Sequence, residues 1–199
     1  MGVTVIEKEG LEADDLLGTI AKRSEAAGYE VSVVSGDRDL LQLASDHIKL
    51  RIPKTKRTWT ENEDYNTKEV LEKYQVTPLQ FIDVKALMGD TADNIPGVPG
   101  IGEKTATNLI VAYGSIENAY AHVEEIKPNR AKEMLKEHYD MAQLSKTLAT
   151  IKIDADIPYD INEARIGNLY TQEAYMMCKR LEVKYLLQRF EVDTPVNTG

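Results

Sequence analysis

Three short groups of carboxylates constrain this chain more than any other feature of its sequence. The groups are GLEADD at 10–15, SGDRD at 35–39 and MGDTADN at 88–94. Each falls at a boundary between expected elements: the start of a helix, the end of a strand and the loop after a helix. If these boundaries meet, so many like charges can coexist only with cations. The seven acids are Glu12, Asp14, Asp15, Asp37, Asp39, Asp90 and Asp93.

The first half of the chain reads as alternating strands and helices. Strands are expected at 3–6, 31–34 and 47–51, and a polar loop or hairpin at 54–65. A helix over 13–27, ended by Gly28, and a helical turn at 40–43 lie between them. Strands separated by helices indicate βαβ units and a parallel sheet, and ligand sites in such sheets lie beyond the carboxyl ends of the strands.

The second half changes to helices joined by short loops. Breaks are expected at 89–102, at 114 and near 128, and they are followed by a long helix over 129–150. A strand-like linker at 151–157 then leads to a final amphipathic helix over 171–190. The single cysteine, Cys178, allows no internal disulfide and is expected to be a small buried residue of that helix. We therefore expect an α/β layer followed by a helical subdomain.

The composition leaves the class of partner open. A net charge of −9 ordinarily argues against a nucleic-acid partner. Setting the seven grouped acids aside leaves −2, and bound divalent cations would cancel part of the groups. The apolar runs are too short to span a bilayer and the chain starts with no basic leader, so a cytoplasmic protein is expected.

Each acidic group, taken alone, also has a purely structural interpretation. Acids in a first turn cap a helix and complement its dipole, which is the favoured interpretation of the first group by itself. An Asx turn explains one aspartate of the second group, and a helix end explains Gly89 and Asn94 of the third. The other acids are surplus to these explanations, and a helix C-terminus is an unfavourable place for negative charge.

The donor chemistry of the groups favours hard cations. Carboxylate oxygens suit Mg²⁺ or Mn²⁺, whereas His47, His122 and His138 are scattered and show no zinc spacing. Carboxylates around two such ions, about 3.5–4 Å apart, are typical of phosphoryl-transfer sites. No segment fits the calcium-binding loop of an EF-hand.

A glycine-rich loop directly follows the third acidic group. Gly97, Gly100 and Gly102 permit a tight turn before a helix that is expected to start near Glu103. Free N–H groups at that helix start can bind a phosphate, with Lys104 and Thr105 as further contacts. An ordinary helix–turn–helix loop that needs glycine for geometry alone is the alternative. Three cations further along could extend a phosphate-binding track, although solvated helix charges explain them almost as well. They are Lys127, Arg130 and Lys132.

The motifs GLEADD, SGDRDLLQL and LMGDTADNIPGVPGIGEKTA, in this order and at these intervals, resemble the 5′-nuclease domain of bacterial DNA polymerase I. That domain belongs to the flap-endonuclease superfamily, and the resemblance covers essentially the whole chain. It implies an incomplete Rossmann-like (PIN-like) parallel sheet over 1–88. A helix-three-turn-helix (SAM-like), DNA-binding subdomain is implied over 89–199.

The resemblance also implies an activity and a ligand set. The activity is removal of 5′ ends and flaps from duplex DNA in replication and repair, with two Mg²⁺ or Mn²⁺ ions. Glu12, Asp14 and Asp15 match ligands nearer the first ion, and the second and third groups match those around the other. Asp14, Asp37 and Asp90 are the expected catalytic carboxylates. The hairpin with Lys104 is implied to bind duplex DNA and to hold a K⁺ ion. The implied location of the protein is the cytoplasm, at the bacterial nucleoid.

One departure from the family pattern gives an alternative function. Family members carry a further metal-binding aspartate and a basic arch before the position that aligns with Gly10, and these are absent here. A missing N-terminal nuclease segment and a C-terminal polymerase domain are therefore expected partners, beside DNA. The alternative is a non-catalytic fragment that binds duplex DNA.

Overall fold

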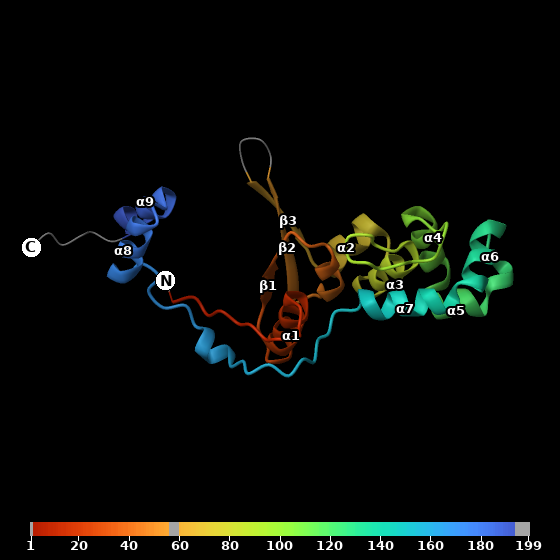
Figure 1. Ribbon diagram of the computed structural model, residues 1–199, viewed down its shortest axis with the longest axis horizontal. Coiled ribbons are helices and arrows are strands. Elements are labelled where there is room, and N and C mark those ends of the chain that lie inside the picture. The colour runs from red at the N-terminus through yellow and green to blue at the C-terminus, as the bar shows by residue number, and fades with distance from the viewer. Residues whose placement is uncertain (1, 56–59, 194–199) are drawn as a thin grey trace, which may run out of the picture. The chain divides into compact units, whose positions relative to one another are not determined.

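The computed structural model describes residues 2–55 and 60–193, which divide into two compact units (Figure 1). One unit comprises Glu9–Asp156, and the other joins Met1–Lys8 to Ile157–Gly199. All three acidic groups and the glycine-rich loop lie in the larger unit, so the geometry among them belongs to a single compact body.

A three-stranded mixed sheet forms the α/β part of the larger unit. Its order is β1 (Val31–Val34), β2 (Ile48–Thr55) and β3 (Thr60–Tyr65). β1 runs parallel to β2, with Val31 opposite Ile48, and β3 runs antiparallel to β2, with Tyr65 opposite Leu50. Alternate side chains of β2 are buried because successive residues of a strand point to opposite faces. The expected parallel pair is confirmed, and the hairpin expected at 54–65 is the β2–β3 pair.

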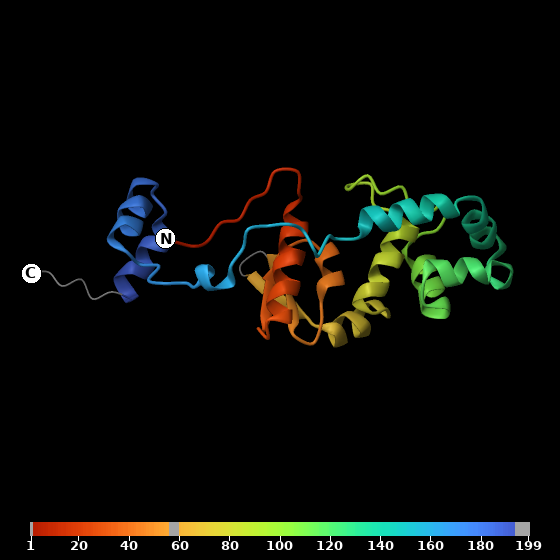
Figure 2. The same ribbon diagram turned by 90° about the horizontal axis from the view of Figure 1, so that it is seen from below.

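Two helical elements pack with this sheet. They are α1 (Ala13–Ala26), which ends before Gly28 as expected, and the 3₁₀ turn η1 (Asp39–Leu43). α1 packs against β1 and η1 (Figure 2), around a core that contains Ala21, Val33 and Leu41. A Cβ on Gly18 would lie 2.7 Å from a methyl carbon of Ile151, so the segment that contains Ile151 crosses α1 too closely for a larger residue.

The rest of the larger unit is helical. Its elements are α2 (Thr67–Tyr74), α3 (Pro78–Met88), α4 (Glu103–Tyr113), α5 (Ile116–Ala121), η2 (Val123–Glu125), α6 (Asn129–Glu137) and α7 (Tyr139–Ala149). α3 is central, since it packs against both α4 and α7 and follows a capping box formed by Thr77 and Gln80. Leu87, Ile110 and Ile116 are among the fully buried residues of this core.

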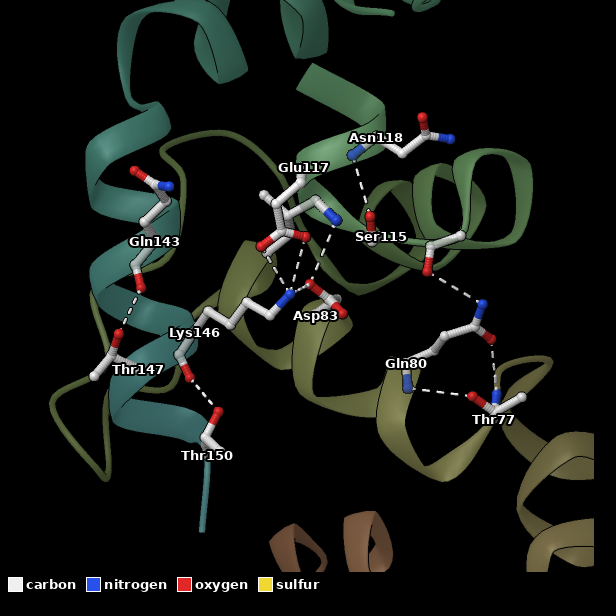
Figure 3. Close-up of polar contacts among 12 residues, drawn as sticks. Thr77, Gln80, Asp83, Ser115, Glu117, Asn118, Gln143, Lys146, Thr147 and Thr150 are labelled. Carbon is white, nitrogen blue, oxygen red and sulfur yellow. Dashed lines mark hydrogen bonds and ion pairs between the residues drawn. The ribbon is translucent and has the colours of Figure 1, made fainter. Parts of the chain in front are cut away.

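An ion-pair cluster around the buried Asp83 ties three of these helices together (Figure 3). The Nζ atom of Lys146 on α7 lies 2.8 Å from Oδ1 of Asp83 on α3 and 2.9 Å from Oε1 of Glu117 on α5. Asp83 Oδ1 also accepts a hydrogen bond from the Ile116 N–H. One lysine therefore fixes the relative positions of α3, α5 and α7.

The smaller unit contains η3 (Ile161–Ala164), α8 (Gln172–Arg180) and α9 (Lys184–Asp193). Ala174, Cys178 and Phe190 form its buried cluster, which confirms the expectation for the cysteine. The single helix expected over 171–190 is wrong: the chain leaves the helix between α8 and α9, where Glu182 has a positive φ of 53°. No helix in the described part of the chain is long and apolar enough to cross a bilayer.

Two other expected elements also differ in the structure. The strand expected at 3–6 is wrong, because Val3 and Val5 are 58% and 85% exposed and this segment pairs with no strand among the described residues. The long helix expected over 129–150 is instead α6 and α7, since the backbone of His138 (φ −119°, ψ 30°) interrupts the helical geometry.

The strand-like linker expected after α7 is extended chain without a strand partner within the described ranges. Side chains satisfy its backbone groups instead. The Gln42 amide oxygen accepts from the Ile151 N–H at 2.9 Å. Thr19 Oγ1 donates to the Lys152 carbonyl and accepts from the Ala155 N–H, at 3.2 and 3.1 Å. The segment is thus held against α1 and η1 without joining the sheet.

Candidate active site

The three acidic groups line one pocket of about 550 Å³ in the larger unit. Its walls come from the start of α1, the loop after β1, the loop after α3 and the chain around the end of α7. Its carboxylates are Glu12, Asp14, Asp15, Asp37, Asp39 and Asp93. The seventh acid, Asp90, lines a neighbouring pocket together with Asp39. Groups that are far apart in the sequence are therefore brought together.

The first group lies at the start of α1, where Glu12 occupies the N-cap position with extended backbone. Its side chain makes no capping hydrogen bond. Oδ1 of Asp15 accepts from the Lys152 N–H at 2.8 Å, which links α1 to the segment after α7. Burial and the nearby charges of Asp37 and Asp39 raise the pKa of Asp14. This group therefore faces the other carboxylates, and capping by Glu12 does not account for it.

The second group forms the turn between β1 and η1. Oδ1 of Asp37 accepts from the Asp39 N–H at 2.8 Å, which is the Asx turn that the structural interpretation expects. The Asx turn does not explain Asp39, whose side chain pairs instead with the ammonium group of Lys85 on α3. Burial raises the pKa of Asp39 and outweighs the opposite effect of Lys85.

The third group follows α3. Gly89 ends the helix with φ of 74°, and Asp90 exchanges two backbone hydrogen bonds with Ile95, at 2.9 and 2.8 Å. Oδ1 of Asp90 accepts from the Ala92 N–H at 2.8 Å. That bond and then the ammonium of Lys85 lower the pKa of Asp90. The turn explains one oxygen of Asp90 and leaves the other directed at Lys85.

Lys85 is a site residue that the sequence analysis missed. It lies on α3 with its side chain only 4% exposed, and its Nζ atom contacts carboxylates of both the second and third groups. Nζ lies 2.9 Å from Asp93 Oδ2 and 3.2 Å from Asp90 Oδ2, and it also hydrogen-bonds Asp39 Oδ2. Burial acts to lower the pKa of Lys85, but the hydrogen bonds to Asp39 and Asp93 raise it overall, so the ammonium stays charged.

The carboxylates match a hard divalent ion in donor type but not in position. Oxygen donors and the accumulated negative charge around Asp14 are what Mg²⁺ or Mn²⁺ require. Within residues 2–55 and 60–193, however, no three His, Cys, Asp or Glu side chains form a group that could hold a metal ion. Three of the seven acids are instead gathered around the Lys85 ammonium.

The glycine-rich loop joins α3 to α4, and Gly97 and Gly100 have positive φ angles of 67° and 78°. A Cβ on Gly97 would lie 2.5 Å from the Gly89 nitrogen, so the packing of the loop requires glycine there. The Gly97 N–H donates to Ser145 Oγ at 3.0 Å. That N–H is therefore used within the fold, as the structural interpretation of this glycine expects.

The start of α4 differs from the loop before it. The helix begins at Glu103 as expected, with Gly102 as N-cap and no side-chain cap, so its first N–H groups have no capping side chain. Lys104 in this turn is exposed, and Thr105 is half-buried. A Cβ on Gly100 would lie 3.3 Å from Arg130 Nε, so the Arg130 guanidinium lies against the loop.

The other two candidate cations of the track differ from each other. Lys132 pairs with Glu124 at 3.5 Å, which favours the structural interpretation of this lysine. Lys127 is exposed. Of the candidate cations, Lys104 therefore lies in the first turn of α4 and Arg130 lies against the loop, and a phosphate-binding track stays a prediction.

Two family models match successive parts of this α/β and helical chain. Residues 1–75 match the N-terminal resolvase-like domain of 5′-3′ exonucleases, and residues 76–172 match their C-terminal SAM fold. The chain belongs to the 5′-3′ exonuclease family, with the α/β and SAM-fold architecture expected from its sequence. The models meet between α2 and α3, and the expected division after residue 88 stays a prediction.

The chain is similar to curated bacterial DNA polymerases. DNA polymerase I of Bacillus caldotenax is 45% identical over 95% of this chain, and that of Bacillus subtilis is 43% identical over 94%. The thermostable DNA polymerase I of Thermus thermophilus is 38% identical over 96%. The chain spans about a fifth of these relatives, 21–22% of their length.

The similar solved structures are nucleases of phage T5. A T5 5′-exonuclease with bound zinc has a TM-score of 0.64 and 26% identity, over 74% of this chain and 52% of the phage chain. A T5 flap endonuclease in complex with DNA and metal ions has a TM-score of 0.61 and 25% identity, over 75% of this chain and 52% of the phage chain. Divalent metal ions therefore bind to structural neighbours of this fold.

Proposed function

We propose that this chain is the nuclease part of a DNA polymerase I-like protein and hydrolyses phosphodiesters at the 5′ ends and flaps of duplex DNA. One observation carries this proposal: the three acidic groups surround one pocket, and the third group leads directly into the hairpin before α4. Membership of the 5′-3′ exonuclease family supports it.

In this function all seven acids hold divalent ions, Mg²⁺ or Mn²⁺, and three of them, Asp14, Asp37 and Asp90, are also the catalytic carboxylates. The other acids are Glu12, Asp15, Asp39 and Asp93. Bound ions of this kind activate water and neutralise the charge that develops on the phosphate.

The hairpin holds the duplex through its phosphates. Gly100, Gly102, Lys104 and Thr105 supply backbone and side-chain donors, which contact DNA without reading its sequence. The carbonyl groups of the same loop provide ligands for a K⁺ ion. In the cell this function would serve the removal of RNA primers and the repair of flaps. It would act beside a polymerase domain, at the bacterial nucleoid in the cytoplasm.

The test is cleavage of a labelled 5′-flap duplex with Mg²⁺ or Mn²⁺, with the products separated on a denaturing gel. We expect product from the wild-type chain and at least a hundredfold less from Asp37→Ala and Asp90→Ala, because each removes a carboxylate at the reacting centre. The control is Asp46→Ala, which removes an exposed acid away from the pocket and should leave cleavage unchanged. Equal cleavage by all four proteins would contradict the assigned roles.

Binding of DNA without cleavage is the second candidate function. The observation that favours it is the Lys85 ammonium, which already engages three of the carboxylates. A gel-shift assay distinguishes the two functions: this candidate gives salt-sensitive binding and no product. Lys104→Ala should weaken binding and reduce the salt dependence by about one counterion, because one phosphate contact is lost. Lys68→Ala, a change at an exposed lysine of α2, is the matched control. Cleavage by the wild-type chain would rule this candidate out.

A further inference from the structure

Lys85 is buried in an unusual way for a lysine. Fully buried lysines are rare unless they are paired, and the Lys85 side chain is 4% exposed in a buried stretch of α3 where Asp83 is the other charged residue. Its ammonium reaches three carboxylates that come from two different loops. It lies where the second and third acidic groups meet, and it supplies positive charge at that point.

The charge balance around Lys85 is incomplete. One ammonium faces Asp39, Asp90 and Asp93, and Glu12, Asp14, Asp15 and Asp37 lie around the adjoining pocket. A buried lysine deprived of its acids would be an uncompensated charge, and acids deprived of the lysine would repel one another. The lysine and these three acids therefore depend on each other whenever no other cation is present.

Space for an alternative position of the lysine exists in the larger unit. A second pocket of about 550 Å³ is lined by Lys85, Asp90 and, across from them, Lys104 and Thr107 of α4. The four-carbon stem of a lysine is flexible, so the ammonium can leave the three acids without a change in the backbone of α3.

We propose that Lys85 is a built-in cation of the acidic cluster: it neutralises Asp39, Asp90 and Asp93 in the metal-free chain, and a divalent ion binds these acids only by displacing it. This inference rests on the metal site of the proposed function but not on cleavage. It accounts for the absence of a three-acid metal group among the described residues of a chain with seven grouped carboxylates.

A permanent structural ion pair is the alternative, and Mn²⁺ binding separates it from the proposal. Free Mn²⁺ is measured by electron paramagnetic resonance during titration of the full chain, without DNA. The variants are Lys85→Met, which removes the ammonium but keeps the length of the side chain, and Lys85→Arg, which keeps the charge. Lys146→Met is the matched control, since it removes a partly buried lysine held by two acids in the same unit.

Lys85→Met is expected to bind Mn²⁺ about tenfold more tightly than the wild type, because no side-chain cation competes for the acids. Lys85→Arg and Lys146→Met should bind as the wild type does. Thermal unfolding gives a second readout: Lys85→Met should lose stability in EDTA and recover it with Mn²⁺, whereas Lys146→Met should lose stability in both.

Each other outcome has a defined meaning. Unchanged or weaker Mn²⁺ binding by Lys85→Met, with no recovery of stability, would overturn the inference while leaving the proposed nuclease in place. If Lys85→Met does not fold without metal, recovery of folding by Mn²⁺ supports the inference and failure to recover opposes it. Absence of Mn²⁺ binding by every protein, the wild type included, would overturn the metal site itself.

Discussion

Two lysines of the same unit, Lys85 (side chain 4% exposed) and Lys146 (31% exposed), contact carboxylates in different ways. Lys146 joins Asp83 and Glu117 and fixes three helices, and no further acid among the described residues pairs with it (Figure 3). Lys85 joins three acids of the second and third groups, and two of these acids, Asp39 and Asp93, line a pocket with further carboxylates. In the first network one lysine faces two acids, which leaves one negative charge in excess. In the second, one lysine faces three acids, which leaves two in excess, and four more acids line the adjoining pocket. A larger excess of negative charge is what a site for a further cation requires.

The largest loss of stability is expected for a substitution of Lys146, and a small loss there would contradict this comparison. Lys146→Met leaves Asp83 buried without its cation, so the free energy of unfolding should fall by about 3 kcal/mol. Burial already raises the pKa of Asp83, and Lys146 opposes that shift. Urea denaturation of both proteins measures the difference. A loss below about 1 kcal/mol, or recovery of stability by Mn²⁺, would show that the two networks are alike.

The same substitution at one acid of each network should give unequal effects. Asp83→Asn is expected to destabilise the chain by about 2 kcal/mol, because Lys146 loses its buried partner. Asp93→Asn should change stability by less than about 0.5 kcal/mol in EDTA, because Lys85 keeps Asp39 and Asp90 and the repulsion among the acids decreases. Equal losses in urea denaturation would mean that the Lys85 network has no excess charge.

The smallest effect concerns pH. Burial acts to raise the pKa of Glu117, but Lys146 outweighs it and the pKa is lowered from 4.5. A carboxyl of this kind stabilises the fold above its ordinary pKa and loses that contribution as the pH falls through its folded value. Since Glu117 is half-exposed, solvent screens the pair, and Glu117→Gln should cost about 0.5 kcal/mol at pH 7. Urea denaturation at pH 7 and pH 3 should show that this difference disappears in acid.

The sequence predicted elements that are decided by local pattern. The helix before Gly28, the strand at Val31 and the start of α4 at Glu103 all depend on neighbouring residues, and all three are present. The breaks at His138 and Glu182 could not be predicted, because no glycine or proline marks either position and the surrounding apolar spacing continues the helical pattern.

Much of the candidate site could be predicted, but its internal cation could not. The three acidic groups could be predicted because several acids fall within each short segment, and they line neighbouring pockets as expected. Lys85 was not predicted as a site residue, because its apolar neighbours Ile82, Val84 and Leu87 are typical of a core helix. The two charges in that stretch, Asp83 and Lys85, were the available signal. Asp90 and Asp93 follow Lys85 closely in the sequence, but Asp39 is separated from it by 46 positions, and only the tertiary structure brings these two residues together.

The hydrogen bond from the Lys152 N–H to Asp15 links a carboxylate of the pocket to one backbone amide of the segment after α7. One oxygen of Asp15 already serves that backbone group, so an ion that draws the carboxylate inwards must weaken the bond. The amide proton of Lys152 would then exchange faster with solvent when the pocket is filled. Thr19 holds the carbonyl of the same residue from its other side, so the loosening would remain confined to one peptide group. The exchange rate of this one backbone amide, which is far from the acidic motifs in sequence, should therefore change when an ion binds in the pocket.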